Sequence, residues 1–215
     1  MLSYYKSINK KVKIKKKGEY VMSKNELTAK EKRMIESVKE NPFNFRRYKE
    51  EDQFEELACV AVKAICQNYH FIRKDLLSDS FIDKLIKLNG YVIGELREGQ
   101  RTLERYLMAI ESRPSVFQYI PKVHLTDELI RKALQRDGTL ICYLEDLGGQ
   151  KEEYCWLALN QNPASIKEIF RPTCEMWEFV LKQNGSLIQY IENPTQELCM
   201  IALEQTSDAV KYISL

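Results

Sequence analysis

The feature that most constrains the fold is an internal repeat, which is clearest at the C-terminal end. Residues 151–215 read as three successive lines: KEEYCWLALNQNPASIKEIFRP, TCEMWEFVLKQNGSLIQYIENP and TQELCMIALEQTSDAVKYISL. Each line passes from acidic residues through an apolar stretch and a polar pair to a turn dipeptide, and then to a short apolar segment with Ile. Self-similarity at periods of about 20–50 residues is typical of repeat architectures.

The repeat extends back to the N-terminal part of the chain. Its central position, which we call the anchor, is occupied in successive units by Ser37, Ala61, Leu85, Ala109, Ala133, Ala158, Val180 and Ala202. A column is the set of residues at the same distance from the anchor in all units. No charged residue occurs in the columns one after, three before and eleven after the anchor, although 30% of the chain is charged. The sequence therefore predicts eight related units.

Each unit is expected to form a helical hairpin. In the first half of a unit, apolar residues lie four and three residues before the anchor, at the anchor and one residue after it, and these positions share one face of an α-helix. In the second half, apolar residues lie seven, eight and eleven residues after the anchor, and these positions share one face of a second helix. Between the two halves lie turn dipeptides: Asn41-Pro42, Asn89-Gly90, Arg113-Pro114, Asp137-Gly138, Asn162-Pro163 and Asn184-Gly185. Gly accepts positive φ and Pro lacks a donor, so these pairs end a helix.

Two units lack these turn residues, and they carry Ile65-Cys66 and Thr206-Ser207 at this point. At Ile65-Cys66 we predict that the two helices continue as one longer helix. Seven residues before the anchor, Ser or Thr residues are predicted N-caps: Ser78, Thr102, Thr126, Thr173 and Thr195. Two residues later comes a Glu column, which we interpret as carboxylates facing the helix dipole and not as a binding stripe: Glu56, Glu104, Glu128, Glu153, Glu175 and Glu197.

We predict an all-α solenoid of about eight stacked hairpins over residues 30–215, preceded by a short cap at 22–29. Residues 1–21 differ in composition, because they hold seven Lys and one Glu and leave 26 of the 33 basic and 30 of the 31 acidic residues to the rest. One interpretation is a basic arm for nucleic acid or an anionic membrane. The interpretation that we favour is an untranslated segment, because codons for residues 17–19 can spell a bacterial ribosome-binding sequence ahead of Met22.

Composition limits the class of protein and its compartment. A content of 44% apolar residues with 8 Gly and 6 Pro in 215 residues fits a folded, helix-rich chain. The sequence has no apolar run of about 18 residues and no secretory signal, so we expect no membrane association. None of the six cysteines forms a C-x-x-C pair, which favours reduced thiols in the cytoplasm.

No constellation of residues points to catalysis. His70 and His124 lie in different units and have no metal-ligand spacing to another His or Cys. The glycines form no phosphate-binding loop, no Ser or Cys lies in a nucleophile elbow, and no pair of acidic residues stands out from the repeating columns. We therefore predict no catalytic, metal or cofactor site and no enzyme, while an enzyme with an unrecognised site stays as an alternative.

Candidate partner-binding residues come from an aromatic column and from two outlying features. Ten residues after the anchor the chain carries Phe71, Tyr119, Tyr143, Tyr190 and Tyr212. Tyr is frequent at interfaces, but we favour the simpler interpretation that each ring covers the flank of the neighbouring hairpin with its hydroxyl in water. Trp156 lies in a column that otherwise holds charged residues, so it is a candidate exposed hot spot.

The first unit is the most polar of the eight. It carries Arg33, Arg46 and Arg47 together with aromatic residues. A terminal repeat is expected to have a polar outer face, and a cluster of Arg and aromatic side chains is also a candidate contact patch. At the other end the chain stops soon after Ile213 without an obvious polar cap, so this C-terminal edge is predicted to seat a second copy of the chain or a partner.

The segments Glu153–Ile169 and Glu175–Ile191 carry the repeat pattern best: acidic, apolar, Ala or Val, apolar, Asn and then Pro or Gly. This pattern resembles a short helical-hairpin repeat family of unknown function found in viral, phage and bacterial proteins, and the resemblance covers residues 30–215. It implies the hairpin architecture and brings no catalytic residues. We expect a protein–protein interaction module, in the form of a phage or mobile-element inhibitor of a host or defence protein, with nucleic-acid binding through the basic N-terminal region as the alternative.

Overall fold

The computed structural model describes residues 27–147 and 150–213. Within these ranges every regular element is a helix, so the predicted all-α class is confirmed. The predicted basic tail at 1–21, the alternative start at Met22 and residues 22–26 of the predicted cap lie outside the described residues. The end of that cap belongs to the first hairpin, because Thr28 is the N-cap of a helix that begins at Ala29.

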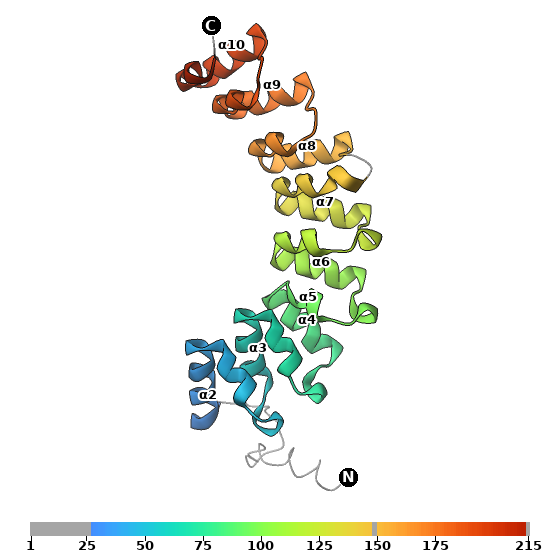
Figure 1. Cartoon of the computed structure of the whole chain (residues 1–215). Coiled ribbons are helices and arrows are strands. Elements are labelled where there is room, and N and C mark those ends of the chain that lie inside the picture. The colour runs from blue at the N-terminus through green and yellow to red at the C-terminus, as the bar shows by residue number, and fades with distance from the viewer. Residues whose placement is uncertain (1–26, 148–149, 214–215) are drawn as a thin grey trace, which may run out of the picture.

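Eight hairpins follow one another in the described residues. Their first helices are α2 (Ala29–Glu40), α3 (Glu55–Ala64), α4 (Asp79–Leu88), α6 (Leu103–Ser112), α7 (Asp127–Arg136), α8 (Glu152–Gln161), α9 (Cys174–Gln183) and α10 (Gln196–Gln205). Their second helices are η1 (Pro42–Arg47), η3 (Cys66–Phe71), α5 (Val92–Glu95), η6 (Pro114–Tyr119), η8 (Gly138–Leu147), η9 (Pro163–Glu168), η10 (Gly185–Tyr190) and η11 (Ser207–Tyr212). Short connecting helices are η2 (Glu50–Asp52), η4 (Lys74–Leu76), η5 (Glu98–Gln100) and η7 (Lys122–His124). Figure 1 shows the hairpins stacked one on the next in an elongated, curved column, and neighbouring helices along the column are in contact.

The second helices, except α5, are 3₁₀ helices marked η, whereas the sequence pattern had indicated only a helical face. A six-residue 3₁₀ helix spans about 12 Å, which nearly matches the roughly 15 Å length of a ten-residue α-helix. The short second half can therefore return along its partner. A period of three also places the residues eight and eleven after the anchor on one face, and Ile166 and Ile169 of the sixth hairpin are both buried there.

The predicted helix starts are confirmed. The hydroxyl oxygens of Ser78, Thr102, Thr126, Thr173 and Thr195 each accept a hydrogen bond from the backbone N–H three residues later. The helices end where the turn column begins, since these residues adopt an extended backbone and their N–H groups donate to the anchor carbonyl. Arg113 N donates to Ala109 O at 2.8 Å in this way. Local caps thus limit most first helices to ten residues.

The turn glycines serve a different purpose from the one expected. Gly90, Gly138 and Gly185 do not have left-handed φ values, so the expectation of positive φ is wrong. A Cβ atom at Gly138 would instead lie 2.3 Å from the carbonyl oxygen of Ala158, the anchor of the next hairpin. The corresponding distances are 2.5 Å for Gly90 and 2.4 Å for Gly185, again to the next anchor. Glycine is present because successive backbones approach closely.

The prediction of one continuous helix across Ile65-Cys66 is also wrong. Ile65 has an extended backbone with φ −140° and ψ 109°, and it separates α3 from η3. The buried amide of Asn68 stabilises the turn, because its Nδ2 donates to the carbonyl oxygens of Ala61 and Pro42 at 3.1 Å each. A side-chain amide therefore holds this turn in a hairpin that has no Gly or Pro.

The core runs through the whole stack. Seven of the eight anchor residues have no exposed surface, and only Ser37 in the first hairpin is half-buried. The buried apolar residues of all hairpins form one connected cluster. Because each hairpin is covered by its neighbours, stability in such a stack is mainly a sum of terms within and between adjacent units.

We predict that Gly138→Ala destabilises the protein by about 1–3 kcal/mol, because the added methyl group collides with the Ala158 carbonyl and overpacks the contact between hairpins. The matched control is Gly99→Ala in η5, where a Cβ atom meets nothing within 4 Å. Urea unfolding followed by circular dichroism measures both. Equal stability of the two variants would contradict the close-approach explanation.

Candidate partner-binding surface

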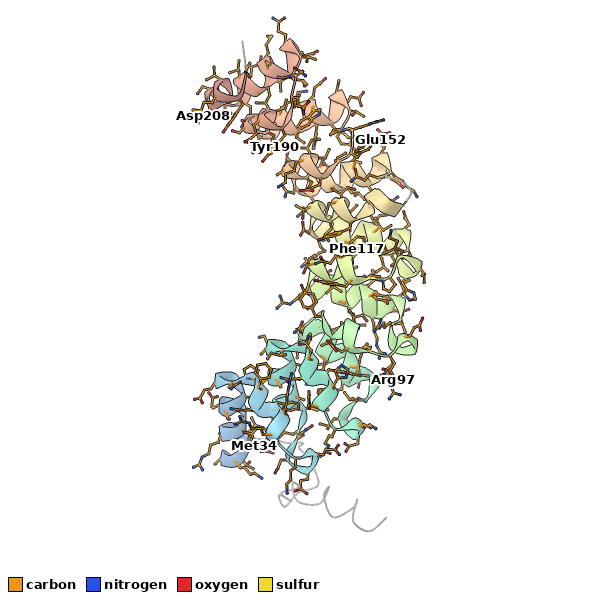
Figure 2. All side chains as sticks on the ribbon, viewed as in Figure 1. Met34, Arg97, Phe117, Glu152, Tyr190 and Asp208 are labelled. Atoms are coloured by element: carbon orange, nitrogen blue, oxygen red, sulfur yellow. The ribbon has the colours of Figure 1, made fainter. Side chains whose placement is uncertain are left out.

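The second helices carry a row of exposed aromatic side chains. Phe71, Tyr119, Tyr143, Tyr190 and Tyr212 have exposed fractions between 43% and 68%. In Figure 2 the labelled Tyr190 and Asp208 lie on the inner side of the curved column, whereas Arg97 and Glu152 lie on its outer side. We call the five exposed aromatic residues Phe71, Tyr119, Tyr143, Tyr190 and Tyr212 the aromatic row.

Members of the aromatic row lean on the preceding hairpin without being covered by it. The ring of Tyr119 meets the ring of Tyr91 edge-on, with centroids 6.0 Å apart. The hydroxyl of Tyr143 donates to Oε1 of Gln118 at 3.0 Å. The favoured interpretation from the sequence, in which each ring covers a neighbouring flank with its hydroxyl in water, agrees with the ring contact of Tyr119, whereas Tyr143 contacts the preceding hairpin through its hydroxyl. Both side chains are otherwise exposed and can contact a partner.

Arg46 is built into a cluster that joins the first two hairpins. Its guanidinium carbon lies 4.7 Å from the ring centroid of Phe43 and 4.6 Å from that of Phe71. Its Nε donates to Oδ1 of Asn68 at 3.0 Å, and Asn68 is fully buried. We call Arg46, Phe43, Phe71 and Asn68 the arginine cluster.

The arginine cluster orients the guanidinium before any ligand arrives. Two rings from different hairpins contact the Arg46 guanidinium, and its Nε–H is already satisfied. Within the described residues its two terminal nitrogens have no hydrogen-bond partner, and because the residue is exposed they are open to a ligand. Such a fixed, planar donor pair suits a carboxylate or a phosphate.

The carboxylate of Glu95, in the third hairpin, contacts two residues of the second hairpin. Oε2 of Glu95 is 2.6 Å from Nε2 of His70. Oε1 of Glu95 accepts a hydrogen bond from the thiol of Cys66 at 3.6 Å. Burial and this carboxylate raise the pKa of the Cys66 thiol, so Cys66 is protonated at neutral pH and is a poor nucleophile.

The other candidates from the sequence have different surroundings. Arg33 is exposed on α2, the other helix of the first hairpin, and Arg47 is exposed beside Arg46. Trp156 is half-buried and is not the freely exposed side chain that its column suggested. Its ring meets that of Phe179 edge-on at 5.5 Å, and its Nε1 donates to Oε1 of Glu152 at 3.3 Å. Trp156 therefore contributes mainly to packing between α8 and α9.

Charged side chains on the first helices pair across the hairpin boundaries. Arg105 is buried and donates to Oδ1 of Asp79 and to Oδ1 of Asp83, each at 2.7 Å. Arg131, which is more exposed, binds the carboxylate of Asp127 in its own helix and that of Glu153 in the next hairpin. These cations are saturated by the protein itself, which leaves the second helices as the better candidate for ligand binding.

One hydroxyl joins this charged network. The Tyr154 hydroxyl donates to Oδ1 of Asp127 at 2.5 Å. Burial and the neighbouring carboxylate raise the pKa of Tyr154 to about 12. The bonds from Tyr154 and Arg131 in turn lower the pKa of Asp127.

Neither a cluster of metal ligands nor a large enclosed cavity is seen where the chain is described, and the hollows of about 550 Å³ beside Arg73 and about 610 Å³ beside Met200 are open surface grooves. No group of three or more His, Cys, Asp or Glu side chains there is arranged to hold a metal ion. A small, partly enclosed cavity of about 90 Å³ lies between the third and fourth hairpins, lined among others by Tyr91, Arg101 and Tyr106. Ligand pockets usually have about 300–1,000 Å³. Among the helices of residues 27–147 and 150–213, none combines the length and the apolar content that a bilayer crossing needs.

Over its described residues the chain is an all-helical repeat protein whose second helices carry the aromatic row and the arginine cluster. Comparisons with protein-family models, with curated proteins and with solved structures give no match to this chain. The resemblance to the short hairpin repeat family therefore stays a prediction from the sequence.

We predict that Arg46 and Phe71 are energetically coupled. In a double-mutant cycle of Arg46→Ala and Phe71→Ala, the coupling free energy of unfolding should be about 0.5–1 kcal/mol, as for an exposed cation–π contact. A control cycle of Arg46→Ala with Tyr190→Ala, which are separated by several hairpins, should be additive. Additivity in both cycles would show that the arginine cluster is not preformed.

Stability at high pH should depend on Tyr154. Its pKa is raised from 10 to about 12, so the protonated hydroxyl of the folded state contributes to the free energy of unfolding below pH 10. This contribution is lost as the pH rises towards 12. Tyr154→Phe should weaken this loss, whereas Tyr190→Phe, an exposed tyrosine, should leave it unchanged. Urea unfolding of the three proteins between pH 8 and about 11 measures the difference. An unchanged pH dependence in Tyr154→Phe would disprove the role of its hydroxyl.

Proposed function

We propose that this protein binds another protein and that the second-helix surface, with the arginine cluster and the aromatic row, makes the contact. The observation that carries the proposal is that exposed aromatic side chains recur at one position on five of the eight described hairpins, the second, fourth, fifth, seventh and eighth. Aromatic residues and Arg are the residue types that most often dominate binding energy at protein interfaces. A curved column with a repeated surface offers an extended site for such a partner.

The chemistry of the cluster suggests what the partner presents. The stacked guanidinium of Arg46 offers two donors in one plane, which match an Asp or Glu carboxylate at the end of the site. The exposed rings further along the stack suit an apolar or mixed surface. We therefore propose a partner with an acidic group beside an apolar strip.

The finer form of the proposal is an inhibitor from a phage or mobile element that covers a functional surface of a host or defence protein in the cytoplasm. Six free cysteines among the described residues support a reducing compartment. The proposal assigns no catalytic activity to the protein. Its support is the repeat pattern and the type of surface, and the phage or bacterial origin depends on the sequence resemblance and on the predicted ribosome-binding sequence ahead of Met22.

Nucleic-acid binding is the second candidate, because Arg46, which contacts two rings, and the exposed Arg33 and Arg47 also suit phosphate groups. The two candidates differ in their response to salt. A complex that depends on several phosphate contacts weakens steeply as salt rises, whereas an interface centred on aromatic residues weakens little.

The test is a quantitative affinity capture from nuclease-treated lysate of the host cell at two salt concentrations. The wild type is compared with Tyr119→Ser/Tyr143→Ser and with Arg46→Ala, and we expect each variant to reduce recovery of a stoichiometric protein by at least about tenfold. Val123→Ser is the matched control, because Val123 is 86% exposed but lies outside the row. Undiminished recovery by both variants would overturn the assignment of the surface. Recovery of nucleic acid alone from an untreated parallel, lost at the higher salt, would favour the second candidate.

A further inference from the structure

A side-chain contact between second helices recurs along the N-terminal half of the stack. The residue nine after the anchor in one hairpin contacts the residue ten after the anchor in the next hairpin. The contacting pairs are Arg46 with Phe71, His70 with Glu95, and Gln118 with Tyr143. At each of these boundaries, the earlier hairpin therefore covers part of the side chain at position ten of the later one.

The third hairpin interrupts this pattern, because Gly94 occupies the position nine after its anchor. The other seven described hairpins have a side chain there: Arg46, His70, Gln118, Cys142, Lys167, Gln189 and Lys211. Tyr119 is the residue that a side chain at position 94 would contact, and at 68% it is the most exposed member of the aromatic row. The partly enclosed cavity of about 90 Å³ is lined by both Gly94 and Tyr119.

The backbone does not require glycine at position 94. Its φ lies outside the left-handed region, and a Cβ atom added there would meet nothing within 4 Å. Gly90 differs in this respect, because a Cβ atom there would collide with a backbone carbonyl. Gly94 lies within α5, where glycine is less favourable than a residue with a side chain. The open space is therefore a property of the surface and not a by-product of the backbone.

The cavity suits the end of an aliphatic side chain. Its walls are mainly apolar and come from two hairpins: Ile93, Tyr106, Val116, Tyr119, Ile120 and Pro121. Its volume of about 90 Å³ equals that of roughly three water molecules at about 30 Å³ each, which is close to the size of a branched aliphatic group. Such a group is stabilised in the cavity because its apolar surface is removed from water.

Two guanidinium groups determine which charge fits beside the cavity. Arg101 lines it and donates hydrogen bonds to two backbone carbonyl oxygens. The guanidinium carbon of Arg113 lies 5.6 Å from the ring centroid of Tyr91, and Arg113 is exposed, with no ion pair to any described residue. Burial raises the pKa of Tyr106, and Arg101 opposes this rise more strongly than Glu98 adds to it. The surroundings are thus positive, which disfavours Lys or Arg as the occupant and favours a carboxylate next to it.

We propose that this cavity, which we call the Gly94 pocket, binds one aliphatic side chain of a partner protein, and that an adjacent Asp or Glu of the partner pairs with Arg101 or Arg113. The bound side chain contacts the ring of Tyr119, as the residue nine after the anchor contacts its neighbour at the other boundaries. This inference rests on the proposed function, because it assigns an anchoring pocket to the same surface. Side chains that fill such pockets often dominate the binding energy of an interface.

Selection of a random peptide library, displayed on phage, against the full chain tests the proposal. The selected peptides should share a Leu, Ile, Val or Met next to an Asp or Glu. A synthetic peptide of the selected sequence is then titrated against the wild type and against Gly94→Leu by fluorescence anisotropy. The new side chain should fill the pocket and raise the dissociation constant of the peptide by at least about tenfold.

Gly99→Leu is the matched control, because a Cβ atom at Gly99 also meets nothing within 4 Å and Gly99 does not line the pocket. It should bind the peptide like the wild type. Urea unfolding should show that Gly94→Leu is at least as stable as the wild type, so that a loss of binding reports on the pocket. The proposal would be overturned by a library without enriched peptides, by selected peptides with Lys or Arg in place of the aliphatic residue, or by equal binding of Gly94→Leu.

The lysate capture separates this inference from the proposed function. Gly94→Leu should reduce recovery of the captured protein as strongly as Tyr119→Ser/Tyr143→Ser does. If Gly94→Leu retains full recovery while the double variant loses it, the Gly94 pocket is overturned and the aromatic row remains the contact surface. Full recovery by both variants and by Arg46→Ala would overturn the pocket and the proposed surface together.

Discussion

At three boundaries between described hairpins, the packing depends on the close approach of a turn glycine to the anchor carbonyl of the following hairpin. The Ala109 carbonyl shows the constraint, because it accepts the N–H of Arg113 and also lies where a side chain on Gly90 would be. At this boundary the turn residue is glycine and the next anchor is the small residue Ala. This contact recurs at Gly138 and Gly185, so it helps to fix the spacing of the hairpins and the repeat period that is visible in the sequence.

The inner hairpins are covered on two sides by their neighbours, and the first and last described hairpins differ from them in opposite ways. The first described hairpin has a half-buried Ser37 at its anchor and exposed charged residues. The last described hairpin keeps apolar residues at Leu203 and Val210, whose counterparts in the other hairpins are buried.

Much of the fold could be predicted from the sequence, because the buried columns and the Ser and Thr caps are local and recur in many units. The 3₁₀ geometry of the second helices could not, since positions seven, eight and eleven after the anchor fit both kinds of helix. The turn at Ile65 was missed because its support comes from Asn68, three residues later. Amide contacts between the loop that leads into a hairpin and the second helix of that hairpin were also missed: Gln53 donates to Phe71 O at 2.9 Å, and Gln150 donates to Glu168 O at 2.8 Å. Gln occupies this position, eight before the anchor, in only two units, which is too few to stand out as a column.

The candidate site was only partly predictable from the sequence. The aromatic row appears as a column, but its exposure depends on how far each ring leans over the preceding hairpin. The arginine cluster combines residues of two hairpins, so no pattern within one unit indicates that Phe43 and Phe71 meet the same guanidinium. A stacked, partly satisfied Arg loses little side-chain entropy on binding, whereas Arg33 and Arg47 would have to be ordered by the partner. For this reason Arg46, among the three arginines of the first hairpin, is the one expected to anchor a ligand.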